Sequence, residues 1–321
     1  MKADQRKREF EANVSNHPQA DILTFSGVEE FDVYNCSQPF KIEKNWYLFG
    51  RVERRDEWMR SWVRLFIRVE KNHWTLVEDA MIYQLEDPYI AKIADDFVLG
   101  GTHVQVKQED VLDAYYGYFY YGKQLDNLKY FTTGPKNMKD IRIVPLADGR
   151  IGVFSRPRDK ELIATYGSEA LIGFTIIDSL NELTADKINQ AKILPNLFAD
   201  LEWGGVNQAF LLDSGKIGVI GHLSFNQDDQ SVYTIVSFVL NPLTLEIADY
   251  QIIATRSCYP TAPAKRAFLQ DCCFPSGMIY HTDDFCELYS GLGDTCEGVM
   301  VISYPFKGHG KIVEKQYIVS D

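Results

Sequence analysis

Apolar and polar residues alternate along the chain in short runs, a pattern that predicts β-strands rather than helices. The runs are rich in Val, Ile, Tyr and Phe and end at turn residues such as Asp148-Gly149 and Ser214-Gly215. Helical periodicity is confined to residues 2–12 and 184–192, where Thr184 is a suitable N-terminal cap. The pattern therefore predicts an all-β protein with two short helices.

One strand–turn–strand shape recurs five times. Each copy has a polar start, two apolar runs separated by a turn, and a polar end. The copies start at Asn45, Asp87, Asp140, Asn207 and Asp271. Further strands are predicted between them at 61–69, 170–178, 233–242 and 298–306. A four-stranded propeller blade needs roughly 40 to 50 residues. The shorter spacings between successive starting residues are close to this length, so the repeat predicts a five-bladed β-propeller with some long loops.

The domain organisation follows from the extent of this repeat. A length of 321 residues allows one large all-β domain or two smaller domains. We predict that residues 1–39 form a short N-terminal arm that packs on the propeller, and that residues 40–321 form a single catalytic propeller domain. In a propeller the ends of the innermost strands meet at one mouth of the central channel, so polar residues far apart in the chain become neighbours there.

The segment "EDP" at residues 86–88 stands at the start of the second copy. Pro88 has no N–H for a sheet ladder and favours an extended conformation at Asp87, so the segment suits the start of an inner strand. An ordinary turn rich in Asp and Pro would fit it equally well.

Composition and charge narrow the function classes. The chain is 45% hydrophobic and 13% aromatic, enough for a large core, and its net charge is −12, which argues against binding to nucleic-acid backbones. The N-terminus lacks the apolar core of a secretory signal, and no run is long enough to span a membrane, so we expect a cytoplasmic protein. The six cysteines show no CxxC pair and no metal-binding Cys/His spacing, so we predict reduced buried thiols and no metal.

With these segments in view, the chain resembles the DUF1861 family, now grouped as the mannosyltransferase/phosphorylases of glycosyltransferase family 108. It is more distantly similar to the β-mannoside phosphorylases of glycoside hydrolase family 130, which are five-bladed propellers. The similar segments are "LEDPYIAKIADDFVLGGTHV" from Leu85, "IGVFSRP" from Ile151, "IGVIGHLSF" from Ile217, and "CFPSG" with "ELYSGLGDT" near the C-terminus. The chain departs from the distant family at Tyr89, where that family usually has Arg.

The resemblance implies a chemistry for the mouth of the channel. A phosphorylase needs one general acid and a cationic cradle for phosphate, whereas an inverting hydrolase needs a second carboxylate to activate water. By this resemblance Asp87 is the general acid, and Lys139, Arg156 and His222 form the phosphate cradle. The residues expected to bind the sugar are Asn45, Arg64, Glu86, Asn207, Asp271 and Asp294. Trp203 and the aromatic run 115–122 are candidates for stacking on a sugar, although such runs also serve core packing.

The predicted function is an inverting β-mannoside phosphorylase or mannosyltransferase that acts on β-1,2 linkages and forms or uses α-mannose 1-phosphate. The expected partners are a mannooligosaccharide and inorganic phosphate as co-substrate, with no cofactor, nucleic acid or membrane, and the sequence leaves the oligomeric state open. Two alternatives remain open: an inverting hydrolase on the same fold, and a glycan-binding propeller without catalysis.

Overall fold

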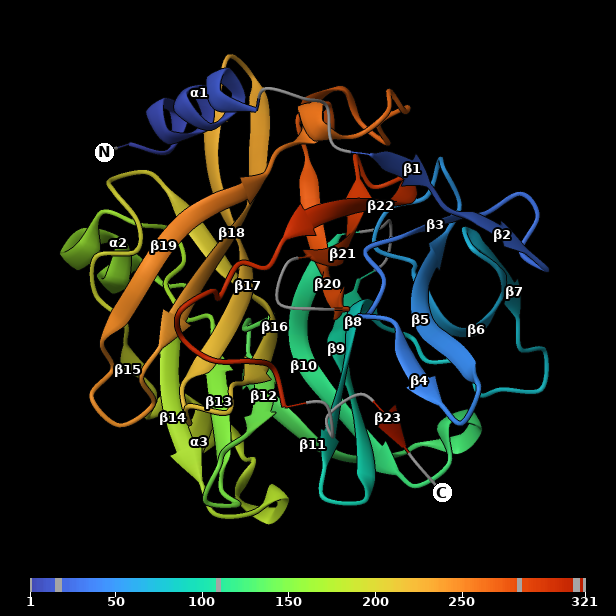
Figure 1. The fold of residues 1–321 in the computed structure, drawn as a ribbon, viewed down its shortest axis with the longest axis horizontal. Helices are drawn as coiled ribbons and strands as arrows, with labels where there is room; N and C mark the ends of the chain where they lie inside the picture. Colours follow the sequence, from blue (N-terminus) through green and yellow to red (C-terminus); the bar gives the residue numbers. More distant parts are fainter. Residues whose placement is uncertain (1, 15–18, 108–110, 282–284, 314–317, 320–321) are drawn as a thin grey trace.

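Five β-sheets surround a central axis, each sheet forming one blade of a propeller (Figure 1). This computed structural model describes residues 2–14, 19–107, 111–281, 285–313 and 318–319. The prediction of an all-β, five-bladed β-propeller is confirmed. We number the blades 1 to 5 in chain order.

Blades 2 to 5 are four-stranded antiparallel sheets. Blade 2 contains β8 (Glu86–Ile93), β9 (Asp96–Val106), β10 (Leu112–Gly122) and β11 (Lys129–Lys136). Blade 3 contains β12 (Arg142–Pro145), β13 (Ile151–Ser155), β14 (Gly173–Ile177) and β15 (Lys192–Ile193). Blade 4 contains β16 (Trp203–Leu211), β17 (Ile217–Gln227), β18 (Gln230–Leu240) and β19 (Ile247–Ala254). Blade 5 contains β20 (Cys273–Tyr280), β21 (Phe285–Leu292), β22 (Cys296–Ser303) and β1 (Ala20–Ile22). The four predicted hairpins of these blades are their two innermost strands; the turn of the last one, at 282–284, lies outside the described residues.

Blade 1 is a seven-stranded sheet whose inner edge differs from the prediction. It contains β2 (Thr24–Ser26), β3 (Asp32–Tyr34), β4 (Phe40–Ile42), β5 (Asn45–Glu53), β6 (Trp62–Glu70), β7 (His73–Leu76) and β23 (Ile318–Val319). Both β3 and β4 pair with β5, so β5 is the second strand and the broken segment 32–42 is the innermost one. The predicted first copy, which starts at Asn45, is therefore shifted by one strand.

The N-terminal segment contributes to two blades before the first predicted repeat. Helix α1 (Ala3–Asn13) lies against β17 and β19 of blade 4 at the edge of the ring (Figure 1). The backbone N–H of Ala3 donates to Glu202, and Lys7 forms an ion pair with Asp271 at 2.9 Å. The strands β1, β2 and β3 follow within the segment predicted as an arm, and β1 forms the outer strand of blade 5, next to β22.

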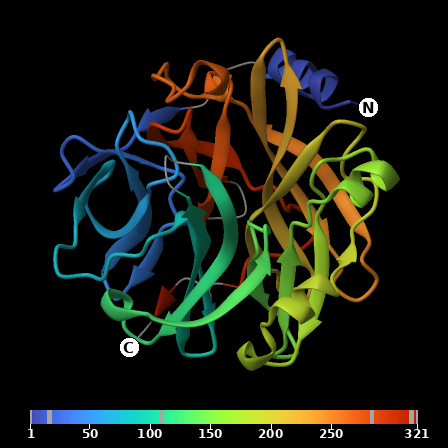
Figure 2. The ribbon, with the colours of Figure 1, turned by 180° about the vertical axis from the view of Figure 1, so that it is seen from behind.

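The remaining helices lie on the blade 3 side of the ring, as the view from behind shows (Figure 2). They are α2 (Lys160–Tyr166), which was not predicted, and α3 (Ala185–Asn189). The predicted cap is confirmed, since the Thr184 side chain accepts a hydrogen bond from the N–H of Lys187. No described helix is long and apolar enough to cross a bilayer.

The core lies between neighbouring blades, where apolar side chains from facing sheets interlock. Between blades 3 and 4, for example, Phe154 and Phe174 pack in one cluster with Val219 and Phe238. All six cysteines are unpaired in the structure, and five of them are buried. The blades are thus held by packing rather than by covalent links, and they fix the residues at the channel mouth.

Candidate active site

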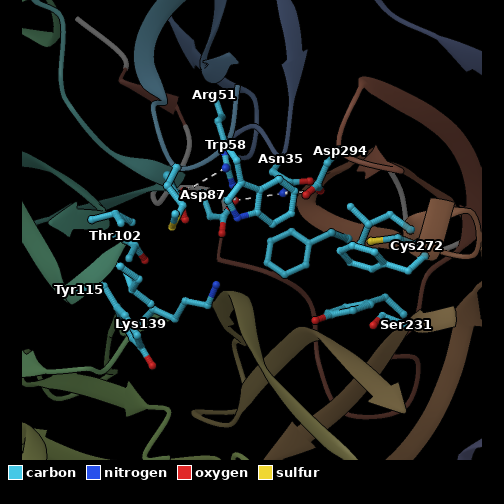
Figure 3. A pocket seen from close by; sticks show the side chains of 18 of the residues that line it. Asn35, Arg51, Trp58, Asp87, Thr102, Tyr115, Lys139, Ser231, Cys272 and Asp294 are labelled. Atoms are coloured by element: carbon cyan, nitrogen blue, oxygen red, sulfur yellow. Dashed lines mark hydrogen bonds and ion pairs between the residues drawn. The ribbon is translucent and has the colours of Figure 1, made fainter. Parts of the chain in front are cut away.

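A pocket of about 310 Å³ opens at one mouth of the central channel. All five blades contribute to its wall (Figure 3). Its charged and amide residues are Asn35, Arg51, Glu86, Asp87, Lys139, Arg158 and Asp294. Its aromatic residues are Trp58, Tyr115, Tyr233, Phe268 and Phe274. The expected convergence of distant polar groups at this mouth is therefore observed.

Asp87 lies at the base of this pocket and is 5% exposed. Its Oδ1 accepts from the Arg51 guanidinium at 3.0 Å and from Asn35 Nδ2 at 3.0 Å. The same Asn35 nitrogen also donates to Asp294 at 3.3 Å, so the two aspartates stand on one side of the pocket. Within the described residues, all side-chain hydrogen bonds of Asp87 go to Oδ1, which leaves Oδ2 for a bound substrate.

Arg51 holds the acidic side of the pocket together. Besides Asp87, its guanidinium forms ion pairs with Glu86 at 3.0 Å and with Glu53 at 3.4 Å. Burial raises the pKa of Glu86 above its ordinary value although Arg51 acts in the opposite direction. Burial likewise raises the pKa of Asp294. The acidic groups thus share the positive charge of a single guanidinium, which is itself buried.

Lys139 reaches into the pocket from blade 3 toward Asp87 (Figure 3). Burial alone would lower its pKa, but the charges of Asp87, Asp140 and Glu86 outweigh that effect and raise the pKa above its ordinary value. Its ammonium group is therefore protonated at neutral pH. Among the described residues it has no ion-pair partner within 4 Å, so this cation is available to an anionic ligand.

Behind Lys139 lies a second charged cluster, formed by blades 3 and 4. Arg156 donates to Asp140 at 2.9 Å and to the carbonyl of Gly204 at 2.8 Å. Burial alone would raise the pKa of Asp140, but the charges of Arg156 and Arg142 hold it at about 2. A Cβ on Gly205 would lie 2.9 Å from the His222 ring and 3.0 Å from Arg156, so only glycine leaves both side chains room there.

His222 belongs to this second cluster but does not line the pocket. Burial, reinforced by the charge of Arg156, lowers the pKa of His222 to about 3, so the ring is neutral at pH 7. Its Nδ1 lies 2.7 Å from Asn207 Oδ1, which can only accept, so the proton is on Nδ1. Nε2 is then an acceptor, and it is buried without a hydrogen-bond partner in the described part of the chain.

Tyr89, the departure from the distant family's pattern, has a structural explanation. Its ring is fully buried, and the Arg142 guanidinium lies 4.6 Å from the ring centroid. Arg142 also donates to the backbone carbonyl of Asn207 at 2.9 Å. An arginine from blade 3 thus covers the position where Tyr89 stands in blade 2, and it ties blades 2, 3 and 4 together below the pocket.

Several site residues adopt a left-handed backbone conformation. The φ angles of Asn35, Asp87, Asp140 and Asp294 lie between 45° and 56°. The prediction of an extended Asp87 before Pro88 is therefore wrong: a break in the ladder between Glu86 and Tyr89 turns its backbone, and Arg51 and Asn35 hold its carboxylate. Asn and Asp tolerate this conformation better than other side chains, and such residues cluster where surrounding contacts fix a functional geometry.

The structure places three predicted sugar ligands away from the pocket. Asn45 is exposed at the start of β5; because β5 runs toward the mouth, Asn45 lies roughly 20 Å before Arg51 along the strand. Arg64 lies on β6 and lines a separate groove with Trp62 and Ile82. The Asp271 carboxylate points to Lys7 of α1. We therefore correct the predictions for these three residues.

Asn207 and Trp203 are near the site but support it from behind. The side chain of Asn207 holds His222, as described above, and neither residue lines the pocket. Trp203 is buried against Tyr233, with ring centroids 6.2 Å apart. Of the aromatic run 115–122, Tyr115 does line the pocket. The described residues contain no cluster of His, Cys, Asp and Glu that could hold a metal ion.

Sequence reasoning missed Asn35, Arg51, Trp58 and Tyr233. Arg51 left a signal, because it is a charged residue inside the apolar strand "YLFGRVE", where burial requires a partner. Asn35 lies in a segment without a clear strand pattern, and Trp58 lies in a polar loop between β5 and β6. Neither could be assigned to the mouth from its neighbours in the sequence.

Comparisons with solved structures identify proteins that are similar to this chain. MPT-1, a GDP-Man-dependent mannosyltransferase from Leishmania mexicana, is 46% identical with a TM-score of 0.91, and the match covers 99% of this chain and 100% of that one. MPT-4, a mannose phosphorylase from the same organism solved with a phosphate ion, is 49% identical with a TM-score of 0.89, covering 97% and 95%. A β-1,2-mannobiose phosphorylase from Listeria innocua shares the fold at 15% identity and a TM-score of 0.62, covering 86% and 91%.

A search among curated protein sequences finds no match. Residues 8–308 match the family described as "Protein of unknown function (DUF1861)", which covers nearly the whole chain. The chain therefore belongs to the DUF1861 family.

Proposed function

We propose that the protein is an inverting β-mannoside phosphorylase that converts a β-1,2-linked mannooligosaccharide and inorganic phosphate to α-mannose 1-phosphate, or runs the reverse transfer. The similarity to MPT-4, a mannose phosphorylase solved with phosphate, supports this class of reaction. The pocket volume of about 310 Å³ suits a ligand of sugar size.

One observation carries the proposal: the carboxylates that line the pocket are gathered on the Arg51 side, while the protonated, unpaired Lys139 stands opposite Asp87. Phosphate is already a good nucleophile and needs neutralisation and aim rather than a base. An inverting hydrolase instead requires a second carboxylate across the sugar, roughly 6.5 to 9.5 Å from the acid. Asp140, which follows Lys139 in the chain, forms an ion pair with Arg156 and does not line the pocket.

In the proposed reaction Asp87 Oδ2 delivers a proton, directly or through a sugar hydroxyl, to the glycosidic oxygen as its bond to the anomeric carbon breaks. A phosphate oxygen attacks the same carbon from the opposite face, which inverts its configuration. Lys139 neutralises the phosphate, and Arg156 adds positive potential from behind. His222 is neutral and does not line the pocket, so we assign it to the support of this cluster rather than to the cations that hold the phosphate.

A GDP-Man-dependent mannosyltransferase is the second candidate. It is favoured by the 46% identity to MPT-1 over almost the full chain. Both candidates use Asp87 and the same sugar: Asp87 is the acid in phosphorolysis and the base that takes the proton of the attacking acceptor hydroxyl in transfer. They differ in whether the anion beside Lys139 is inorganic phosphate or the diphosphate of a nucleotide sugar.

The test is incubation of the purified protein with β-1,2-mannobiose, with and without phosphate, followed by NMR detection of α-mannose 1-phosphate. Product that forms only with phosphate is expected. Mannose release that is independent of phosphate would establish the hydrolase, and mannobiose consumption in neither condition would refute the phosphorylase. A parallel reaction with GDP-mannose and mannose tests the second candidate.

A further inference from the structure

Two loops meet at the rim of the pocket on the side of blades 1 and 5. Residues 54–61 connect β5 to β6 and carry Trp58, and residues 255–272 connect β19 to β20 and carry Phe268. The ring centroids of Trp58 and Phe268 are 6.4 Å apart with an angle of 64° between the planes. Both residues line the pocket and both remain exposed, at 38% and 40%. We call this pair the Trp58–Phe268 rim.

The rim is held in place by buried charges rather than by its own packing. Lys265, in the second loop, forms a buried ion pair with Glu53 and donates to the carbonyl of Arg54 at 3.0 Å, so it bridges the two loops. Glu53 also accepts from the backbone N–H of Arg60 at 2.9 Å. Two large apolar rings are therefore held in a fixed position where they face solvent. Exposing apolar surface to water is unfavourable, and a binding surface explains why the rings are exposed here.

Arg266 fixes the orientation of the indole. Its guanidinium carbon lies 5.5 Å from the centroid of the Trp58 ring, and its Nη2 donates to the carbonyl of Asp56 at 3.5 Å. Since Trp58 is supported in this way and still partly exposed, its remaining surface is open to the pocket, as Figure 3 shows.

The inverting mechanism indicates which part of the substrate lies at the Trp58–Phe268 rim. The nucleophile and the leaving group occupy opposite faces of the reacting sugar. The cations proposed to hold phosphate, Lys139 and Arg156, belong to blade 3 and are backed by His222 of blade 4. The leaving sugar must then lie across Asp87, toward blades 1 and 5, and there the apolar C–H face of a pyranose meets the Trp58–Phe268 rim.

We propose that the Trp58–Phe268 rim is the binding surface for the acceptor, the sugar that leaves in phosphorolysis and attacks in synthesis. This inference rests on the proposed function for the direction of the reaction. It makes Trp58 a specificity-determining residue that acts on acceptor binding and leaves the donor side unchanged.

The test compares Trp58→Ala and Phe268→Ala with Trp62→Ala in the synthetic direction, with mannose 1-phosphate as donor and mannobiose as acceptor. Trp62 is a matched control because it is 45% exposed, lies four residues away and lines a different groove. We expect each rim variant to raise the acceptor KM about fivefold, because an aromatic contact of this kind contributes on the order of 1 kcal/mol. The KM for mannose 1-phosphate should change less than about twofold, and Trp58→Phe should recover part of the loss.

An acceptor KM in Trp58→Ala equal to that of the wild type, or an equal rise in the KM for mannose 1-phosphate, overturns the inference. If the wild type shows no turnover, the proposed function fails, and calorimetric binding of β-1,2-mannobiose still tests the rim. Weaker binding in Trp58→Ala than in the wild type and Trp62→Ala supports the inference. Equal binding in all three proteins, or no binding by the wild type, refutes it. Thermal unfolding of every variant verifies that it is folded.

Discussion

Asn35 Nδ2 lies 3.0 Å from Asp87 Oδ1, although the two residues belong to different blades. The same amide also reaches Asp294 of blade 5, so one side chain of blade 1 links the acidic groups of its two neighbours. With Arg51 on the same oxygen, Asp87 is held at Oδ1 and open at Oδ2. The site is therefore built from contacts between blades.

Asp87→Asn should abolish most of the turnover. The amide cannot deliver a proton to the departing oxygen, so kcat should fall by roughly 10²- to 10⁴-fold, the range that general acid catalysis contributes. Initial rates of phosphorolysis measure this effect. Asp95→Asn, an exposed carboxylate in the turn of the same hairpin, is the control and should retain wild-type rates. A fully active Asp87→Asn would rule out Asp87 as the acid.

Lys139→Ala should weaken the binding of phosphate more than that of the sugar. The substitution removes the one pocket cation that has no ion-pair partner among the described residues, and a hydrogen bond to a charged group contributes about 1.5 to 3 kcal/mol. The KM for phosphate should therefore rise at least about tenfold. Lys136→Ala, at the exposed end of β11, serves as the control. Unchanged phosphate affinity in Lys139→Ala would place the anion elsewhere.

Glu297 should make the stability of the fold depend on pH. It is fully buried on β22 and accepts from Ser276 Oγ at 2.6 Å and from the N–H of Cys36 at 3.1 Å. Burial raises the pKa of Glu297 from 4.5 to about 7. Because the folded state favours the protonated form, the stability that Glu297 contributes is present below about pH 4.5 and is lost as the pH rises toward 7.

Glu297→Gln removes this titration, since the amide stays neutral. The free energy of unfolding should then fall less between pH 5 and pH 8 than in the wild type, by roughly 2 to 3 kcal/mol. Urea unfolding across that range measures the difference, and Glu70→Gln, exposed at the end of β6, should follow the wild-type profile. Parallel profiles for Glu297→Gln and the wild type would contradict the assignment.

Gly100→Ala should destabilise blade 2 and disturb the site. A Cβ at this position would lie 2.1 Å from the ring of Tyr89, which is buried under Arg142. Such overpacking costs about 1 to 3 kcal/mol, which thermal unfolding would detect as a lower Tm. At Gly122, in the same sheet, the nearest atom would lie 3.5 Å away, so Gly122→Ala should change stability by less than about 0.5 kcal/mol. Equal effects at both positions would contradict this account.

The strands of blades 2 to 5 could be predicted because each hairpin alternates apolar and polar residues between clear turns. The inner segment of blade 1 could not, because "DVYNCSQPFKI" is interrupted by Asn35 to Pro39 and shows no continuous strand pattern. Because this segment was missed, the predicted blade 1 was shifted by one strand. Asn45, at the opposite end of β5, was therefore predicted at the site instead of Asn35, which contacts Asp87.

The residues of the candidate site also fall into those that the sequence could predict and those that it could not. Glu86, Asp87, Lys139 and Asp294 were predicted and do line the pocket, because each stands beside an inner strand at the mouth; their roles stay predictions. Asp271 also stands at such a position, but its side chain turns to Lys7 of α1. Sequence spacing places a backbone at the mouth, whereas side-chain direction depends on partners from distant segments. The same holds for His222, whose neutral state is set by burial and Arg156.

The pairing of β1 with β22 brings one of the first strands of the chain beside one of the last. The ring can therefore close only after nearly the entire polypeptide has been synthesised. The pocket shares this timing, since Asn35 has to meet Asp294 across the same seam. A fragment that ends before blade 5 would keep Asp87 with Arg51 and Asn35 but would lack Asp294 and one wall of the pocket. Carbohydrate chemistry should therefore arise in a single step when the circle is complete.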